Sequence, residues 1–529
     1  MIIPSRERTL PVALAAAAAI GGAIAALRYH ELGLTLSHYD ARGHLVVARR
    51  IVDSLTPGWQ QVGAVWLPLP HLLNAIPVQI DTFYRTGASA VAISIAAFAI
   101  ATGAIAWIVL QQTQSTLGAL VAAAVFALNP NVVYLQATPM TEPLLLALTT
   151  LSVALLTAGL KSRATSTSRA SPLDSADPWV LGTRATRTSR ADAMIGWAFA
   201  LACLTRYEAW PVTGCALAGA VWARWRRGNS LKAALRRVMP IAVYPAVAIV
   251  AFAIFSRVVI GEWFVAPGFF VPDNKSLGQP VLAAAEIWWG THQLSGDLTV
   301  AIAAAGLAGL FATGLFFRDR ADQVVVLSLA ATAVVPWFAF VEGHPFRIRY
   351  MVPLIAIEAI GAGVAVGFFN FGFFSRGARL VAALLAALVV AYELRPLDAT
   401  APMVVEAQWD RPNVPARAHV TDCLRAQYDG DTIMASMGSL AHYMQEASRD
   451  GFDVRNFLHE GNGDIWLAAL QGPRPYAGWV LIEEKAEGGD MLATIARQHP
   501  HFLDGYSRMC EGAGLALYRR QNRMLNVSR

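Results

Sequence analysis

A short polar stretch near the N-terminus brings together groups that can do acid–base chemistry. Residues 38–44 read His-Tyr-Asp-Ala-Arg-Gly-His, and apolar residues follow at helical spacing. The apolar positions are Leu45, Ala48, Val52 and Leu55. They predict an amphipathic helix that lies along a membrane surface. Asp40 and His44 are four residues apart, so the carboxylate and the imidazole would share one face of that helix.

Three further polar stretches lie beside long apolar runs, at residues 138–143, 205–211 and 342–350. The first carries Glu142 and ends at Pro143, directly before a leucine-rich run, where a carboxylate is costly unless it is paired or faces water. The other two contribute Arg206, Glu208, Arg347 and Arg349. Guanidinium groups bind phosphate in bidentate fashion and stay charged, so these stretches suit an anionic substrate.

The composition requires a membrane around these stretches. Of 529 residues, 55% are hydrophobic and 15% are charged, and the mean hydropathy is +0.44. These values exclude an ordinary soluble protein and a disordered chain. The formal net charge of +6 reflects loop arginines and indicates no nucleic-acid partner. Eleven apolar blocks are expected to span, at 10–27, 88–110, 117–128, 143–160, 193–204, 211–223, 238–256, 298–317, 323–341, 350–369 and 379–394.

Lysine and arginine are more frequent in the loops on one side of these blocks. The positive-inside rule therefore puts the N-terminus in the cytoplasm and the C-terminus outside. All four polar stretches then lie on the outer face. The block 10–27 is interpreted as a span and not as a signal peptide, because no clear cleavage site precedes a polar mature start.

The expected fold is an α-helical polytopic membrane protein with a soluble outer domain. Residues 1–392 form the membrane module, with a long outer loop at 28–85 and a flexible cytoplasmic linker at 161–192 that is rich in Ser, Thr and Arg. Residues 393–529 have an ordinary soluble composition and form an outer α/β domain. Strands are expected at 431–436, 479–483 and 515–518, and helices at 439–449 and 491–498.

Cysteine and histidine spacing indicates no structural metal site, because the four cysteines show no CxxC pattern. Cys423 and Cys510, in the outer domain, either form a disulfide or remain two buried thiols. Cys203 and Cys215 lie at or in spans and are expected to pack as apolar residues. The histidines beside Asp40 are expected to make hydrogen bonds at a helix end. No cofactor is expected, and a divalent cation is kept as an alternative.

The order of the motifs resembles a known family. The motifs are an Asp soon after the first span, a Pro-rich stretch at 66–73, Arg85 at the start of a span, Thr-Glu-Pro at 141–143 and Thr-Arg-Tyr-Glu at 205–208. They are similar to motifs of the polyprenyl-phosphate-dependent membrane glycosyltransferases of the GT-C superfamily. The branch that this chain resembles contains the protein O-mannosyltransferases and the lipid A aminoarabinose transferase. The resemblance covers roughly the N-terminal two thirds of the chain.

Two positions depart from the family pattern. Many relatives have Asp-Glu where this chain has Asp40 followed by Ala41, so Glu142 becomes the candidate for the second acidic function. Relatives often carry Lys before the Pro-rich stretch as a partner of the lipid phosphate, and this chain has Leu67 there. The candidates for that partner are Arg206, Arg347, Arg349 and His71.

The resemblance implies that a hexosyl or pentosyl group moves, with inversion, from a polyprenyl-phosphate donor to a lipid, glycan or protein acceptor on the outer face. Asp40 would be the general base, with N-capping of its helix as the alternative. Glu142 would orient the acceptor or hold a cation, or would pair with an arginine for structure alone. Glu208 would position Arg206, and His44 would bind substrate. For the arginines, snorkelling at the membrane edge is the alternative.

A transporter or lipid flippase is the alternative function, and a non-catalytic protein whose outer domain binds a partner is a second one. Transporters commonly carry related repeats and charges near the middle of the membrane. In this sequence the charges collect at the outer ends of the spans, which favours an enzyme. The Ala- and Arg-rich composition favours a bacterial cell membrane, whose lipid would be a partner throughout.

Overall fold

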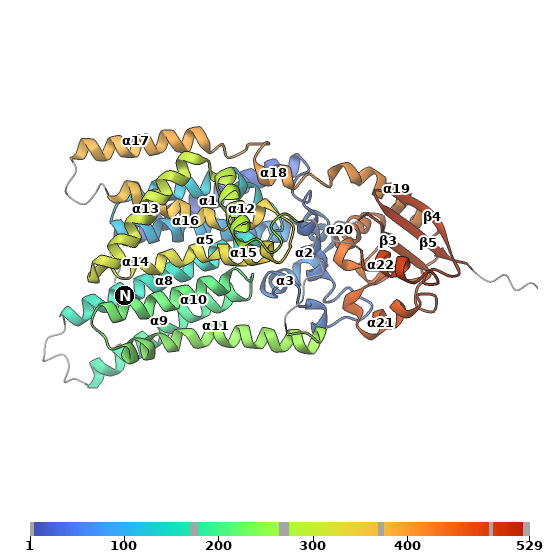
Figure 1. Ribbon diagram of the computed structural model, residues 1–529, viewed down its shortest axis with the longest axis horizontal. Helices are drawn as coiled ribbons and strands as arrows, with labels where there is room; N and C mark the ends of the chain where they lie inside the picture. Colours follow the sequence, from blue (N-terminus) through green and yellow to red (C-terminus); the bar gives the residue numbers. More distant parts are fainter. Residues whose placement is uncertain (1–4, 170–177, 264–273, 369–374, 486–489, 522–529) are drawn as a thin grey trace, which may run out of the picture.

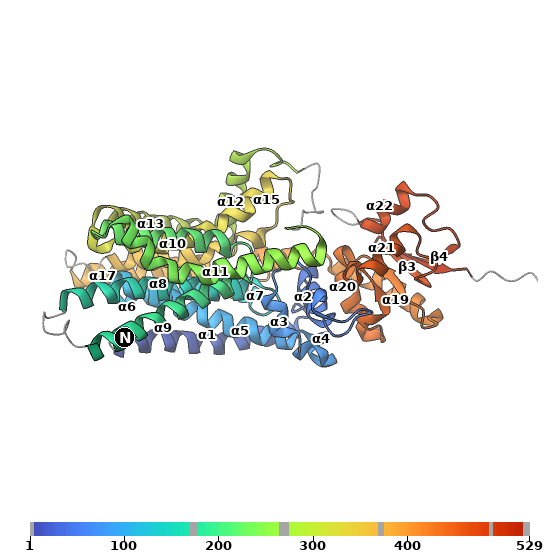
Figure 2. The same ribbon diagram turned by 90° about the horizontal axis from the view of Figure 1, so that it is seen from below.

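The molecule is elongated, with a helical bundle at one end and a small sheet domain at the other (Figure 1). The structure, a computed structural model, describes residues 5–169, 178–263, 274–368, 375–485 and 490–521. Short helices from the segment 28–85 lie between the bundle and the sheet domain in both ribbon views (Figures 1 and 2). They are α2 (Tyr39–Arg49), α3 (Leu69–Asn74) and α4 (Asp81–Thr86). This middle layer separates the membrane part from the C-terminal domain.

Helical structure occupies each of the eleven apolar blocks. The bundle helices are α1 (Ser5–Glu31), α5 (Ala88–Thr113), α6 (Thr116–Ala127), α8 (Glu142–Arg169), α9 (Pro178–Cys203), α10 (Ala209–Arg226), α11 (Leu231–Ile260), α13 (Asp297–Phe316), α14 (Gln323–Val326), α15 (Val334–Val341), α16 (Leu354–Phe368) and α17 (Arg376–Glu393). Two short helices, α7 (Pro130–Leu135) and α12 (Pro280–Ser295), complete this part. Among the described residues, 6 helical stretches are long and apolar enough to cross a membrane. The count of eleven spans therefore stays a prediction.

Two helix crossings in the bundle depend on glycine. A Cβ on Gly306 of α13 would overlap the carbonyl oxygen of Gly361 in α16, and one on Gly363 would lie 2.5 Å from the carbonyl oxygen of Gly118 in α6. The backbones therefore touch at both crossings, as small residues permit between membrane helices. Because α13, α6 and α5 all pack around α16, that helix is buried along most of its length.

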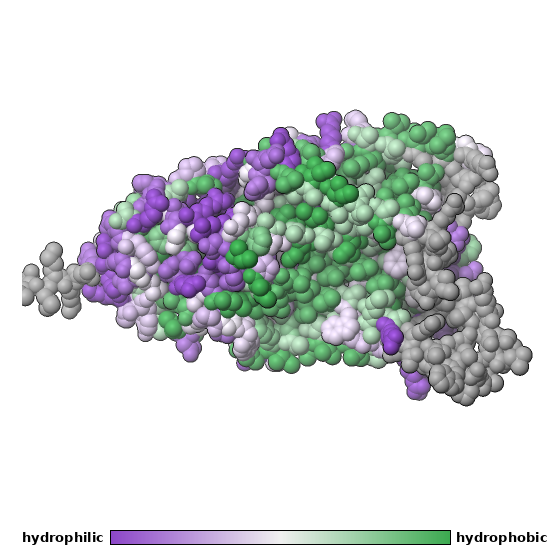
Figure 3. All heavy atoms as spheres, turned by 180° about the vertical axis from the view of Figure 1, so that it is seen from behind, coloured by the Kyte–Doolittle hydropathy of each residue, from purple (hydrophilic) through white to green (hydrophobic). Residues whose placement is uncertain are grey.

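The outer surface of the bundle is apolar. In Figure 3 a broad hydrophobic surface covers the bundle, and the sheet domain is mainly hydrophilic. Exposed apolar side chains line α11, for example Val243, Val247, Val250 and Ile254. Surface of this kind suits lipid and not water. The bundle is thus the membrane part of a multi-pass membrane protein.

Helix α2 is present where a helix was expected, but its surroundings differ from the prediction. It ends at Arg49, so Val52 and Leu55 lie outside it and are exposed. Leu45 and Ala48 are buried against the sheet domain and not in lipid. The expectation that this apolar face meets lipid was wrong, because the apolar period of a helix is the same whether its partner is lipid or protein.

The segment 161–192 also differs from the flexible linker that was expected. Helix α8 continues into it as far as Arg169, and α9 begins within it at Pro178. The remaining part, 170–177, lies outside the described residues. An existing helix adds residues at little cost, so a polar composition alone does not end it.

The C-terminal domain is built on a five-stranded sheet with strand order β2-β1-β3-β5-β4. Its strands are β1 (Ile433–Ala435), β2 (Phe457–Leu458), β3 (Trp479–Glu483), β4 (Tyr506–Gly512) and β5 (Leu515–Arg520). Strand β1 pairs in parallel with β2 and with β3. Strand β5 pairs in antiparallel fashion with β3 and with β4. Its helices are α19 (Val414–Gln427), α20 (Met437–Ala447), α21 (Asp464–Gln471) and α22 (Met491–Gln498). The expected α/β fold is confirmed.

The segment that joins the two parts packs with the membrane module. Helix α18 (Pro402–Glu406) contributes Met403 and Val404 to the main core of the bundle. The backbone N–H of Met403 donates to Asn131 Oδ1 at 2.9 Å. Residues just after the predicted boundary at 393 therefore belong to the wall of the membrane module.

A disulfide joins two elements of the C-terminal domain, and its removal is the first prediction. Cys423 in α19 and Cys510 in β4 are bonded, with Cα atoms 6.5 Å apart and a sequence separation of 87. Replacing both by Ala should lower the free energy of unfolding by about 4 kcal/mol, because the unfolded chain regains loop entropy. Thermal unfolding of the purified protein measures this, with Cys215→Ala, an exposed free cysteine, as the control. An unchanged midpoint in the double variant would contradict it.

Candidate functional site

A cavity of about 120 Å³ lies where the middle layer meets the bundle. Its walls come from α2, the Pro-rich stretch, the residue before α8, the turn between α9 and α10, and the turn before α16. The lining residues are Asp40, His44, Trp66, Leu67, His71, Thr141, Thr205, Arg206, Tyr207, Glu208, Arg349 and Tyr350. The four polar stretches of the sequence thus meet at one place.

Six of the predicted site residues line this cavity, namely Asp40, His44, His71, Arg206, Glu208 and Arg349. Glu142 lies behind the wall in contact with Arg206. Arg347 is not brought to the cavity, since its guanidinium lies over Trp409, 5.5 Å from the ring centroid. Arg349 is inside the 3-10 turn Ile348–Met351 and Arg347 precedes that turn, which explains why their side chains separate.

Asp40 and Arg349 form an ion pair in the cavity wall. His38 is the N-cap of α2, and its Nδ1 accepts from the backbone N–H of Asp40 at 3.1 Å. The Asp40 side chain is therefore not the helix cap. Burial opposes its ionisation, but the attraction of Arg349 and His38 lowers the pKa of Asp40 to about 2. The carboxylate is charged at neutral pH and is a weak base while Arg349 holds it.

Arg206 is held by two carboxylates and a hydroxyl. Its Nη1 donates to Glu142 Oε1 at 2.9 Å and to Thr141 Oγ1 at 3.0 Å. Its Nη2 donates to Glu208 Oε1 at 2.7 Å. Burial would lower the pKa of Arg206, but Glu142 and Glu208 raise it above its ordinary value. The side chains of Glu142 and Glu208 are 0% and 6% exposed, so the arginine supplies the charge that their burial requires.

His44 and His71 form a pair of buried imidazoles in the wall. His44 Nδ1 and His71 Nε2 are 3.0 Å apart, and the ring of Trp66 lies 4.1 Å from that of His44. Burial lowers the pKa of both histidines, to about 3 for His71, so the pair is neutral near pH 7 and one ring donates to the other. Gly43 permits this close approach of Trp66, because a Cβ there would lie 3.0 Å from Trp66 Cη2.

Glu406 is a buried carboxylate beside the site that the sequence interpretation missed. Its Oε2 accepts from the backbone N–H of Ile348 at 2.8 Å, and its Oε1 lies 3.7 Å from His38 Nε2. It thereby links the turn that carries Arg349 to the cap of α2. The sole sequence signal is a carboxylate within the apolar run 403–407, in a segment whose composition assigned it to the outer domain.

Several buried polar atoms around the cavity lack a hydrogen-bond partner within the described residues. Among them are Arg349 Nε, a donor, and Glu142 Oε2, an acceptor. A buried polar group without a partner costs about 1–3 kcal/mol. A ligand with an anionic group in the cavity would satisfy the N–H of Arg349 Nε.

The histidines and carboxylates do not form a metal centre in the part of the chain that the structure covers. No group of three or more His, Cys, Asp or Glu residues in the described ranges has the arrangement that a metal ion needs. A role for a divalent cation therefore stays a hypothesis from the sequence.

Solved structures show the fold. ArnT from Cupriavidus metallidurans, in a crystal structure bound to undecaprenyl phosphate, is similar with a TM-score of 0.54 and 13% sequence identity, covering 96% of this chain and 97% of that chain. Its crystal structure in the apo state gives a TM-score of 0.52 at 13% identity, covering 95% and 98%. No family model matches the sequence, and no curated protein matches it. ArnT is a lipid A aminoarabinose transferase and a GT-C glycosyltransferase, so this chain has a GT-C-like fold.

Removal of Arg206 gives the second prediction. Arg206→Ala should destabilise the protein by about 3–5 kcal/mol, because it leaves two buried carboxylates without their cation. Denaturant unfolding in detergent measures this, and Arg347→Ala, outside the cavity, serves as the matched control. Adding Glu142→Gln and Glu208→Gln to Arg206→Ala should recover most of the loss, since no buried charge then remains unpaired. A wild-type midpoint for Arg206→Ala would rule out the structural role.

Proposed function

We propose that this protein is a membrane glycosyltransferase that moves one hexosyl or pentosyl group from a polyprenyl-phosphate donor to a hydroxyl of a lipid, glycan or protein acceptor. The observation that carries the proposal is the cavity in which one carboxylate, Asp40, meets the guanidinium groups of Arg206 and Arg349 beside a lipid-facing bundle. The fold supports it, because the similar ArnT has been crystallised bound to undecaprenyl phosphate.

The donor phosphate binds at the two cavity arginines. Arg349 has a buried Nε–H with no partner in the described structure, and Arg206 lines the same cavity. Guanidinium groups give charge-assisted hydrogen bonds to phosphate oxygens and hold their orientation. Arg347 does not take part, because its guanidinium lies over Trp409.

Helix α3 connects the cavity with lipid. His71 lines the cavity, whereas Leu72, Leu73 and Ile76 of the same segment are 52%, 46% and 84% exposed. Exposed apolar residues of this kind suit contact with acyl chains. A substrate with its phosphate in the cavity and its polyprenyl chain in lipid would contact both the polar and the apolar face of this segment.

The reaction is a single displacement at the anomeric carbon. The acceptor oxygen forms a bond to that carbon, the bond from the carbon to the phosphate oxygen breaks, and its electron pair leaves with the phosphate. Asp40 takes the acceptor proton as general base, and one displacement inverts the anomeric configuration. Glu142 acts from behind the wall, through its ion pair with Arg206.

Arg349 couples donor binding to the basicity of Asp40. In the structure its positive charge holds the pKa of Asp40 at about 2, against the effect of burial, which makes the carboxylate a poor base. A phosphate that engages Arg349 offers a competing negative charge and weakens this ion pair. Asp40 therefore becomes a stronger base when the donor is bound.

A transporter or flippase is the alternative function. Transporters commonly carry charged groups near the middle of the membrane. Helix α2, which lines the cavity, instead lies at the end of the bundle that faces the C-terminal domain (Figure 1). We assign this end to the outer face of a bacterial cell membrane, with the C-terminal domain outside.

The third prediction tests the base. Asp40→Asn should lower the transfer rate at least about a hundredfold, because the amide cannot accept the acceptor proton. Binding of undecaprenyl phosphate should be retained, because the substitution releases Arg349 for the phosphate. Transfer assays with purified protein measure the rate, and Asp297→Asn, an 86% exposed carboxylate on α13, is the control. Wild-type turnover by Asp40→Asn would reject the assignment.

The fourth prediction concerns the phosphate. Arg349→Lys should weaken undecaprenyl-phosphate binding about tenfold or more, since a point charge cannot reproduce the planar fork. Arg347→Lys is the matched control and should bind like wild type. Binding is measured by titration of the labelled protein in detergent. If Arg206→Ala and Arg349→Ala both bind like wild type, the phosphate site lies elsewhere.

A further inference from the structure

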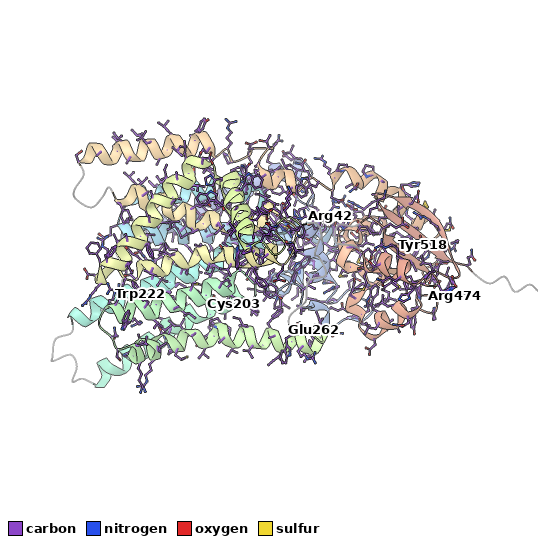
Figure 4. All side chains as sticks on the ribbon, in the orientation of Figure 1. Arg42, Cys203, Trp222, Glu262, Arg474 and Tyr518 are labelled. Carbon is purple, nitrogen blue, oxygen red and sulfur yellow. A yellow bond between two sulfur atoms is a disulfide. The ribbon has the colours of Figure 1, made fainter. Side chains whose placement is uncertain are left out.

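Helix α2 has two faces with different partners. Asp40 and His44 line the cavity, whereas Leu45 and Val46 are buried with the core of the C-terminal domain. Arg42 follows Asp40 by two residues, which turns its side chain about 200° around the helix, to the far side from the cavity. In Figure 4 Arg42 lies at the boundary between the bundle and the C-terminal domain. The helix that carries the candidate base is thus enclosed between the two parts of the molecule.

Arg42 ends a buried chain of charges that belongs to the C-terminal domain. It forms an ion pair with Glu446 of α20. Both oxygens of Glu446 accept from Arg417 of α19, at 2.7 and 2.8 Å. Arg417 also donates to both oxygens of Asp410, at 2.7 Å each. The side chains of Arg42 and Arg417 are 10% and 3% exposed, so solvent screens these pairs weakly.

The loop after α2 is fastened to the same domain. Arg49 donates to Asp53 at 2.8 Å, and Asp53 accepts from Arg455 at 2.7 Å. Gln61 donates to the carbonyl oxygen of Gly461 at 2.7 Å. Gly461 follows β2, at the carboxyl edge of the parallel strands where open α/β sheets commonly bind a ligand. In this protein the first outer loop lies at that edge.

We infer that the C-terminal domain is a positioning element for the candidate base, with Arg42 as the positioning residue and Glu446 as its support. The inference rests on the proposed function for its catalytic consequence. An 11-residue helix is marginal by itself, so the place of α2 depends on what packs against it. Buried ion pairs add little net stability but favour one geometry, and a displacement of about 1 Å at a reacting group can cost a hundredfold in rate.

The fifth prediction tests this in the full chain with Glu446→Gln. The amide keeps the volume of the side chain but removes the negative charge from Arg42. The kcat should fall about tenfold to a hundredfold, with the KM for the donor within about twofold of wild type. Asp422→Asn is the matched control, because its ion pair with Arg425 lies on the surface of the same domain, with both side chains more than half exposed.

A disulfide between α2 and α20 distinguishes a loss of positioning from other effects of Glu446→Gln on kcat. A Cβ on Gly43 of α2 would lie 3.7 Å from the Cβ of Ala441 in α20, a separation that a disulfide spans. Adding Gly43→Cys and Ala441→Cys to Glu446→Gln should restore most of the lost kcat. The control carries Gly43→Cys and Glu446→Gln alone, so that any contact of the new Cβ with Trp66 is common to both.

Three results would overturn the inference. One is a wild-type kcat for Glu446→Gln. Another is a lowered kcat that a disulfide, verified by mass spectrometry, does not restore. The third is unchanged amide hydrogen exchange over residues 39–49 in Glu446→Gln, where faster exchange, reversed by the disulfide, is expected. The exchange measurement needs no substrate, so absence of transfer by the wild-type protein would reject the proposed function and leave this test standing.

Discussion

The ion pair between Asp40 and Arg349 joins the segment 28–85 to the turn before α16, and it fixes how these two walls of the cavity meet. A buried charge is costly unless an opposite charge lies within reach, so neither residue can be placed without the other. The same rule applies to Arg206 with Glu142 and Glu208, and to Arg42 with Glu446. The helices must therefore meet at fixed registers, and the close crossings at Gly306 and Gly361 deep in the bundle hold those registers.

Much of the site could be predicted because polar residues are easily recognised in the sequence of a membrane protein. In an apolar sequence each short polar stretch is conspicuous, and order along the chain placed Asp40, Arg206 and Arg349 on one side of the membrane. The difference between Arg347 and Arg349 could not be predicted, since both precede the same apolar block. The local 3-10 turn decides which one reaches the cavity. Glu406 was missed because its role comes from contacts with Ile348 and His38, which are distant in sequence.

Much of the fold could also be predicted from the sequence. Hydropathy predicts the apolar helices, since a membrane span requires a long apolar run, and short continuous apolar runs predict strands β3 and β5. Strand β2 has two residues and β4 is interrupted by an irregularity between Arg508 and Cys510, so neither carries a clear period. The partner of an apolar helix face is not encoded locally, which is why α2 was assigned to lipid and is covered by protein.

The pair formed by Asp53 and Arg455 spans 402 residues of sequence, and it has a consequence for synthesis. Ribosomes make the N-terminus first, and domains of large proteins generally fold as units in that order. The residues that line the cavity are therefore all made before the last quarter of the chain, which supplies Glu446, Arg455 and the other C-terminal partners of α2 and the loop after it. A nascent or prematurely terminated polypeptide would contain every residue that lines the cavity. It would still lack the C-terminal residues that bind α2 and the loop after it. Full positioning of α2 would thus arise only at the end of translation.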